Sequence, residues 1–357
     1  MNYIRFSIVF YVFLASVGIL ITLEPAYSQH LGGRNGFAFL RLPTNAPQAA
    51  LGGSNLSLIN SNVNLFTANP ALLNTAMHKH ASFNFVPYYT GVNYSTLTYA
   101  HKFNKAGRWG VALQYLDYGS FEETDATGAV VGSFQANDFV VTTAHARSIG
   151  PYTVGMNVKL AGSTIAEYNA YGLLLDMGGV FKHPEHDLTI GLLIKNAGFA
   201  FKSYTPGNNL GMPFDVQVGT SFKPEFMPLR FSFTAHHLHT FDIAYDDPAY
   251  NTIIDQNGNQ VIEKISFTDK LFRHFVFGTE ILLSKAFQLQ AGYNHLVRQE
   301  MKLENRMAGA GLSFGASLQI KAFQMAYSRA YHHAAGGVSY LTLISNFGAL
   351  IKKKESK

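Results

Sequence analysis

The sequence has no cysteine and few charged residues, and each of these absences excludes a class of protein. Only 14% of the 357 residues are charged, whereas a soluble domain carries about 25%. Without cysteine there is no disulfide scaffold, no thiolate zinc site and no cysteine nucleophile. The net charge is +5, and the last six residues contribute +3 of it. The rest of the chain therefore offers no basic surface for nucleic acid.

Long apolar runs are also scarce, and the one at the N-terminus indicates secretion. Arg5 precedes a mostly apolar run over residues 6–23, which is followed by the small-residue pattern Ala26-Tyr27-Ser28. This is the pattern of a signal peptide, and we expect residues 1–28 to be removed. An N-terminal membrane anchor is the alternative, because a run of this length could just span a bilayer.

Aromatic residues and glycine are abundant instead, with 29 Phe, 19 Tyr and 32 Gly. From Tyr152 to Leu160 every second residue is apolar, and the residues between them are Thr, Gly, Asn and Lys. Segments of about ten residues that alternate in this way are typical of transmembrane β-strands. The polar positions are mostly uncharged, which suits a barrel lumen better than a soluble surface. The sequence therefore predicts an all-β fold, a transmembrane antiparallel β-barrel.

The alternation predicts about 14 strands, an even number that suits a bacterial single-chain barrel. They are expected near 81–87, 94–103, 107–117, 138–148, 152–163, 170–182, 187–196, 214–222, 229–238, 272–284, 287–296, 306–314, 318–328 and 338–347. Connectors after even strands are short (104–106, 149–151, 183–186, 315–317), and several after odd strands are long (118–137, 197–213, 239–271). This predicts extracellular long loops, with both ends of the barrel in the periplasm.

The remaining segments complete the expected organisation. Residues 29–80 mix Pro, Ala and Gly with short apolar pieces, and we expect them to fold back as a luminal plug, because 14 strands enclose space that must be filled or wet. The barrel is expected over 81–347, followed by a basic periplasmic tail over 348–357. Residues 255–259 begin like a calcium loop, but Ser266 stands where the bidentate Glu is needed. Asn257-Gly258 between β-branched runs predicts a hairpin turn there instead.

The histidines are the candidates for metal or catalytic chemistry. His237 and His239 would share a strand face and could hold a divalent metal. They stand at a strand end, where such residues mark the interfacial girdle, and no third ligand is implied. Ser232 and Thr234 share a face with His236, but nothing supplies a third group for a nucleophile and base. We therefore predict no catalytic residue, no metal and no cofactor, and a protein that is not an enzyme.

Several blocks of sequence resemble a known family. Residues 37–43 (Phe-Ala-Phe-Leu-Arg-Leu-Pro), 49–53 and 69–73 are similar to the N-terminal pattern of the PorV/PorQ family of type IX secretion, which is related to the long-chain fatty-acid transporter barrels. Three downstream blocks narrow the resemblance to the PorQ branch: 114–119 with 132–138, 195–198 with 202–204 and 213–215, and 231–239. The resemblance covers nearly the whole mature chain. The ten residues after Phe347 depart from the usual barrel C-terminus.

The resemblance implies a non-enzymatic outer-membrane component of the attachment complex. Its partners would be outer-membrane lipid and a PorZ-like surface protein, alongside a PorU-like sortase and a PorV-like barrel. Exposed aromatics are typical anchors at interfaces, so the expected partner-binding residues are the aromatics of the outside loops: Phe121, Phe134, Tyr204, Phe241, Tyr245 and Tyr250. The alternative function is transport of long-chain fatty acids or other hydrophobic molecules. The polar lumen faces argue against that alternative, although the plug could supply an apolar path.

Overall fold

The computed structural model describes residues 36–207, 210–244, 252–254, 260–262, 265–301, 309–333 and 336–350. Fourteen strands of this part form one closed antiparallel barrel, which confirms the expected fold class. The expected signal peptide, residues 1–28, and most of the basic tail lie outside the described residues. The described residues contain no helix that is both long and apolar enough to cross a membrane.

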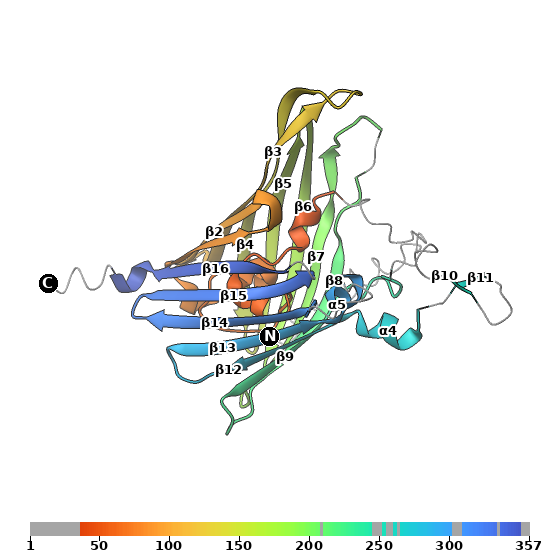
Figure 1. Ribbon diagram of the computed structural model, residues 1–357. Helices are drawn as coiled ribbons and strands as arrows, with labels where there is room; N and C mark the ends of the chain where they lie inside the picture. Colours follow the sequence, from red (N-terminus) through yellow and green to blue (C-terminus); the bar gives the residue numbers. More distant parts are fainter. Residues whose placement is uncertain are drawn as a thin grey trace. The chain divides into compact units, whose positions relative to one another are not determined.

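The barrel is closed by pairing of its first and last strands. β1 pairs with both β2 and β16, and β9 pairs with β12. In Figure 1 the wall of β12 to β16 crosses in front of the wall of β3 to β7, as tilted barrel strands do. The barrel strands are β1 (His80–Pro87), β2 (Asn93–Phe103), β3 (Gly107–Thr124), β4 (Val130–Ile149), β5 (Tyr152–Ile165), β6 (Tyr168–Lys182), β7 (Leu188–Lys202), β8 (Asp215–Phe222), β9 (Leu229–Ala235), β12 (Phe275–Ile281), β13 (Phe287–Asn294), β14 (Leu312–Ile320), β15 (Phe323–His333) and β16 (Gly336–Asn346).

The alternation along β5 is the one that the sequence predicts. Val154 and Met156 are 53% and 46% exposed, whereas Asn157 and Lys159 on the opposite face are buried. Other strands carry similar outward Leu, Val, Ile and Phe side chains. A closed barrel with an apolar outer surface satisfies all backbone groups internally and can face lipid. The chain is therefore an outer-membrane β-barrel.

Three expected connectors are wrong. The connector 197–213 begins too early, because β7 continues to Lys202. Of the other two, the first, 118–137, is mostly strand: β3 continues to Thr124 and β4 begins at Val130. The second, 315–317, lies inside β14, and the turn falls at 321–322 instead. Small residues of this kind are typical of a turn, but here they make room for the segment inside the barrel: a Cβ added at Gly315 would lie 2.7 Å from the Ala50 Cβ.

The described residues of the N-terminal segment, 36–79, lie inside the barrel (Figure 1). They form short helices: η1 (Ala38–Arg41), α2 (Ala46–Ala50), α3 (Leu65–Ala68), η2 (Pro70–Leu72) and η3 (Thr75–Met77). Three of these begin at an Asn whose side-chain oxygen accepts a backbone N–H: Asn45 from Gln48, Asn69 from Ala71, and Asn74 from Ala76. Such caps stabilise helix starts, so local sequence sets the path of this interior segment.

The barrel has two ends. The terminal end holds the start of β1 and the end of β16. The loop end holds the connectors after β1, β3, β5, β7, β9, β13 and β15, with η4 (Tyr89–Gly91), α4 (Phe267–Phe272) and α5 (His295–Glu300). β10 (Thr252–Ile254) pairs with β11 (Gln260–Ile262), as expected of the strands of a hairpin. The expected turn, residues 255–259, lies outside the described residues.

Candidate functional site

The interior segment, residues 36–79, packs directly on the inner wall. Phe66, Leu56 and Leu72 are each exposed by 1% or less. Inward glycines allow its backbone to approach the strands: a Cβ at Gly155 of β5 would lie 2.5 Å from the Pro70 carbonyl carbon. A side chain at that position would displace the interior segment, so wall and segment fit each other closely.

Hydrogen bonds also hold the interior segment to opposite parts of the wall. The Ala46 N–H donates to Thr342 Oγ1 of β16 at 2.9 Å. The Ser313 hydroxyl of β14 donates to the Ala50 carbonyl at 2.9 Å. On the other side the Asn157 amide donates to the Phe66 carbonyl at 3.1 Å. These polar wall residues form hydrogen bonds with backbone groups of the interior segment. The polar inner faces predicted from the sequence therefore bind this segment instead of lining a water-filled channel.

A buried ion pair lies on the inner face of β5, β6 and β7. Lys159 Nζ lies 2.6 Å from Asp176 Oδ2, with their side chains 5% and 0% exposed. Asn196 accepts a hydrogen bond from Lys159 Nζ at 2.8 Å and donates its backbone N–H to Asp176 at 2.8 Å. Asn196 has a φ of 56° at a register shift between β6 and β7. The shift turns this polar residue into the network, which leaves both charges hydrogen-bonded.

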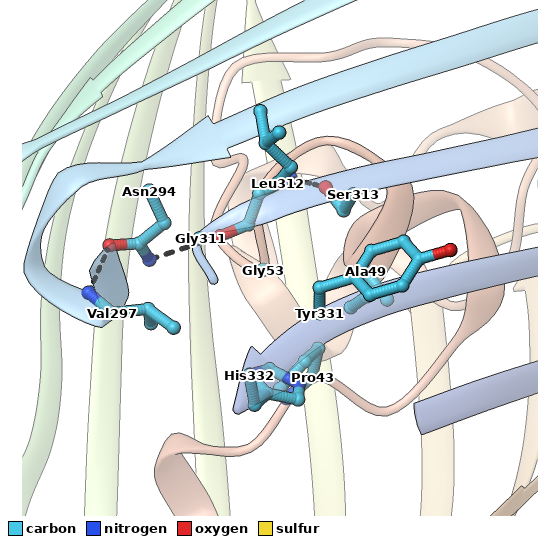
Figure 2. A pocket seen from close by; sticks show the side chains of 12 residues that line it. Pro43, Ala49, Gly53, Asn294, Val297, Gly311, Leu312, Ser313, Tyr331 and His332 are labelled. Carbon is cyan, nitrogen blue, oxygen red and sulfur yellow. Dashed lines mark hydrogen bonds between the residues drawn. The ribbon is translucent and has the colours of Figure 1, made fainter. Parts of the chain in front are cut away.

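A small pocket of about 20 Å³, enough for about one water molecule, opens at the loop end between the interior segment and β13 to β15 (Figure 2). Pro43 comes from the interior segment, and Leu312, Tyr331 and His332 come from the wall. Asn294 accepts the Val297 N–H at 3.2 Å, which caps α5 beside the pocket. The lining combines small and apolar groups with one amide, one hydroxyl, one phenol and one imidazole. The pocket is far smaller than the roughly 300 to 1,000 Å³ of ordinary ligand pockets.

Phe121 and Phe134 are brought together, but on strands rather than on a loop. They face each other across β3 and β4, with ring centroids 5.3 Å apart in a stacked arrangement. Beyond Asp117 most residues of this hairpin are exposed on both faces. The β3–β4 hairpin therefore stands out past β2, as Figure 1 shows at the yellow tip.

The other expected partner-binding residues are divided. Tyr204 is not an open anchor: its hydroxyl donates to Ser163 Oγ, and its ring packs against the interior cluster around Phe37. Phe241 is 48% exposed and stacks on Phe267 at 5.3 Å. Tyr245 and Tyr250 lie outside the described residues.

The assignment of the histidine cluster to an interfacial girdle is wrong for His236. β9 ends at Ala235 rather than at 238, and His236 is only 5% exposed. Burial, with the adjacent His237 ring, lowers the pKa of His236 to about 3. Asp215 lies beside these rings. Asp215 is not recognisable from the sequence as a partner of these histidines, although it lies in one of the family-like blocks, because nothing in the local pattern pairs the start of β8 with the end of β9.

No protein-family model matches the chain, and no curated protein matches it in sequence. Among solved structures, the barrel is similar to the toluene transporter TbuX of Ralstonia pickettii, with a TM-score of 0.48 and 12% identity over 85% of this chain and 97% of that chain. A FadL homologue of Pseudomonas aeruginosa has a TM-score of 0.47 and 11% identity over 85% and 98%. A deltaS2 mutant of the monoaromatic hydrocarbon channel TodX has a TM-score of 0.46 and 13% identity over 85% of this chain and 98% of that chain. Likeness at this level does not assign a substrate.

Proposed function

We propose that this barrel is a non-enzymatic outer-membrane anchor that holds a surface protein at its loop end. The observation that carries the proposal is the β3–β4 hairpin. About eight residues of β3 extend beyond Leu116, which corresponds to roughly 26 Å of strand. A hairpin exposed on both faces has little reason to carry a stacked Phe121–Phe134 pair unless a partner covers it, because exposed aromatic clusters mark interaction sites.

The filled interior supports the same proposal. Residues 36–79 are packed and hydrogen-bonded against the inner wall on several sides. A protein that works through its outer surface does not need an open lumen. A rigid interior segment would instead hold the wall in one shape, which gives the hairpin a fixed base.

The finer proposal is a place in the type IX secretion attachment complex, with the loop end outside the cell and a PorZ-like partner. It is supported by the family-like blocks, several of which meet at the loop end. In the first, the Tyr118 hydroxyl donates to Asp138 at 2.7 Å and joins blocks 114–119 and 132–138. In another, the His237 N–H donates to Asp215 at 2.6 Å and joins blocks 213–215 and 231–239.

A matched pair of variants tests the anchor. Phe121→Ser with Phe134→Ser removes the stacked pair, and Phe226→Ser removes a phenylalanine that is 93% exposed at the opposite end. Pull-downs from detergent extracts, with partners identified by mass spectrometry, should recover a surface protein with the wild type and with Phe226→Ser, but much less with the double variant. Equal recovery with all three would contradict the hairpin as the docking surface.

Transport of a hydrophobic molecule is the second candidate, and it requires the interior segment to move, because the loop-end pocket has room for about one water molecule. The similar barrels named above are described as transporters or channels for toluene and monoaromatic hydrocarbons. Uptake of toluene by cells with and without the gene tests this function. Uptake that falls on deletion would support it. Equal uptake with and without the gene would exclude transport of toluene by this barrel.

A further inference from the structure

We propose a divalent transition-metal site at the loop end, formed by Asp215, His236 and His237. These residues stand at the start of β8 and just after the end of β9, and their approach depends on strand pairing rather than on sequence spacing. None of these residues belongs to the β3–β4 hairpin, so the experiment on this site and the experiment on the hairpin can fail separately.

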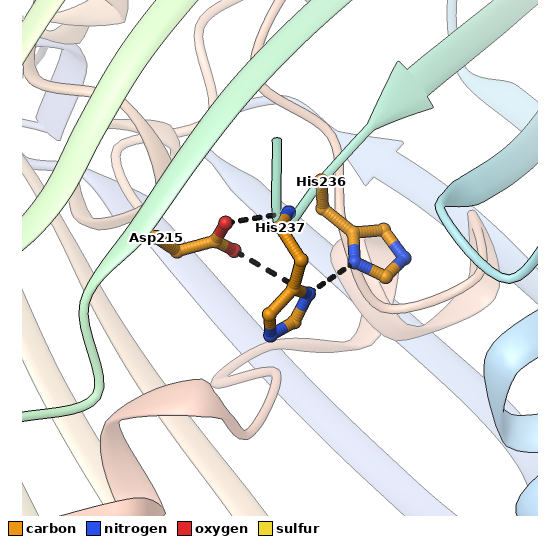
Figure 3. A group of neighbouring side chains, drawn as sticks. All are labelled: Asp215, His236 and His237. Atoms are coloured by element: carbon orange, nitrogen blue, oxygen red, sulfur yellow. Dashed lines mark hydrogen bonds and ion pairs between the residues drawn. The ribbon is translucent and has the colours of Figure 1, made fainter. Parts of the chain in front are cut away.

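The donor atoms converge (Figure 3). Figure 3 shows the His236 and His237 rings turned toward each other, and their Nδ1 atoms are 2.6 Å apart. His237 Nδ1 lies 4.0 Å from Asp215 Oδ2. One ligand atom from each of the three residues fits within a mutual distance of 4.8 Å. His239 Nδ1 lies 4.0 Å from Asp215 Oδ1 but does not belong to this group of three.

These separations are close to those of an occupied site. Zinc binds imidazole nitrogen and carboxylate oxygen at about 2.0 to 2.2 Å in tetrahedral geometry, which places ligand atoms roughly 3.3 Å apart. The His236–His237 distance of 2.6 Å would have to widen, and the 4.0 Å distance from His237 to Asp215 would have to shorten, each by less than about 1 Å. The distance from His236 to Asp215, which is within 4.8 Å, would have to shorten by up to about 1.5 Å.

The backbone is shaped to bring the rings together. His237 has a φ of 55°, in the left-handed region that only a few per cent of non-glycine residues adopt. Its N–H donates to Asp215 Oδ1 at 2.6 Å, and the next N–H, of Leu238, donates to the Val216 carbonyl at 3.0 Å. Uncommon backbone conformations of this kind cluster at functional sites.

The surrounding residues also orient the carboxylate. The Gln217 amide donates to Asp215 Oδ2 at 2.6 Å. Gln217 in turn accepts a hydrogen bond from Ser54 of the interior segment at 3.4 Å. Outer partners of this kind fix the direction of a metal-binding group. A bound ion would therefore join two wall strands next to the interior segment.

The charges and donor types decide which ion fits. Arg41 lies near enough to His236 to influence it electrostatically, as Lys195 does with Asp215. These cations disfavour any divalent ion, so the donor types decide between ions. Ca²⁺ and Mg²⁺ bind mainly to oxygen ligands, of which this set offers only one carboxylate. A set rich in imidazole suits Zn²⁺, Cu²⁺ or Ni²⁺. The alternative is a plain hydrogen bond between His236 and His237, with Asp215 only accepting the His237 N–H.

Titration of the metal-free full-length protein, purified in detergent without a polyhistidine tag, distinguishes these two possibilities. Zn²⁺ followed by calorimetry should bind with one ion per chain, and Ca²⁺ should not compete. Asp215→Asn keeps an acceptor for the His237 N–H but removes the charged ligand. Loss of a residue that only orients a metal ligand weakens metal binding about 10- to 100-fold, so loss of the ligand itself should weaken Zn²⁺ binding at least as much. His236→Ala should do the same.

The control is a second histidine pair. His183 and His186 stack at 4.7 Å in the turn after β6, at the terminal end, and their double Ala variant should bind Zn²⁺ as the wild type does. Trp109 fluorescence confirms that each variant is folded. Absence of stoichiometric binding by the folded wild type would overturn the proposal. Binding that survives both Asp215→Asn and His236→Ala would equally overturn it, since the ion would then sit elsewhere.

Discussion

A single charge placed on the lipid face tests the barrel and its register most sharply. On β5 we take the outward residues from Tyr152 to Gly162 as the part that crosses the membrane. Tyr152 packs on the Phe181 ring, and the Phe139 ring covers Gly162, so aromatic rings stand at both ends. These ten steps of about 3.3 Å, on a strand tilted by about 40°, rise roughly 25 Å, the height of the apolar band. Met156, 46% exposed, therefore lies close to the bilayer midplane.

Met156→Arg should reduce the free energy of unfolding by about 2 to 4 kcal/mol, the cost of Arg at the midplane of a barrel. Val131→Arg is the control: Val131 is 62% exposed on the β3–β4 hairpin, beyond the apolar band, and its change should cost about 0 to 1 kcal/mol. Urea unfolding in lipid vesicles, followed by the single tryptophan, Trp109, measures both. Equal costs for the two variants would refute the placement of β5 in the membrane.

Three further predictions concern the interior and the orientation. Asp176→Asn leaves Lys159 buried without its counter-charge and should cost about 3 to 5 kcal/mol of stability, whereas the double variant Asp176→Leu with Lys159→Met should recover most of it; recovery of nothing would contradict the ion-pair account. Gly155→Val pushes a side chain into the Pro70 backbone and should cost about 1 to 3 kcal/mol, whereas Gly179→Val on β6, where a Cβ meets nothing within 4 Å, should be close to neutral by thermal unfolding. A cysteine at Ala126 should react with an impermeant thiol reagent on whole cells and one at Lys105 should not; labelling at Lys105 alone would reverse the proposed orientation.

The period-two pattern predicts most of the wall. Because neighbouring residues of a strand point to opposite faces, the sequence alone assigns the two faces of β5, and Met156 and Asn157 lie where the pattern predicts. Strand ends are harder to predict. Gly315 and its small neighbours resemble a turn, and only their contact with Ala50 of the interior segment explains them as strand.

The candidate sites depend on contacts that sequence spacing does not contain. Phe121 and Phe134 are expected from the sequence as loop anchors, but their pairing follows from the register of β3 and β4. Asp215 and His236 are 21 positions apart in sequence and meet only because β8 and β9 are neighbours. Asn157 is expected simply to face the lumen, yet it binds the Phe66 carbonyl, because the interior segment fills that space.

The measurement that tests the central claim most directly is made in cells, by shortening the β3–β4 hairpin. Joining Asp117 to Asn137 through a short glycine turn removes the part beyond the barrel mouth, and changes confined to such a tip are usually tolerated. The account predicts that the shortened barrel stays in the outer membrane, that the surface partner is lost to the medium with its cargo unprocessed, and that uptake of toluene is unchanged. Retention of the partner together with reduced uptake would contradict it and would establish the barrel as a transporter.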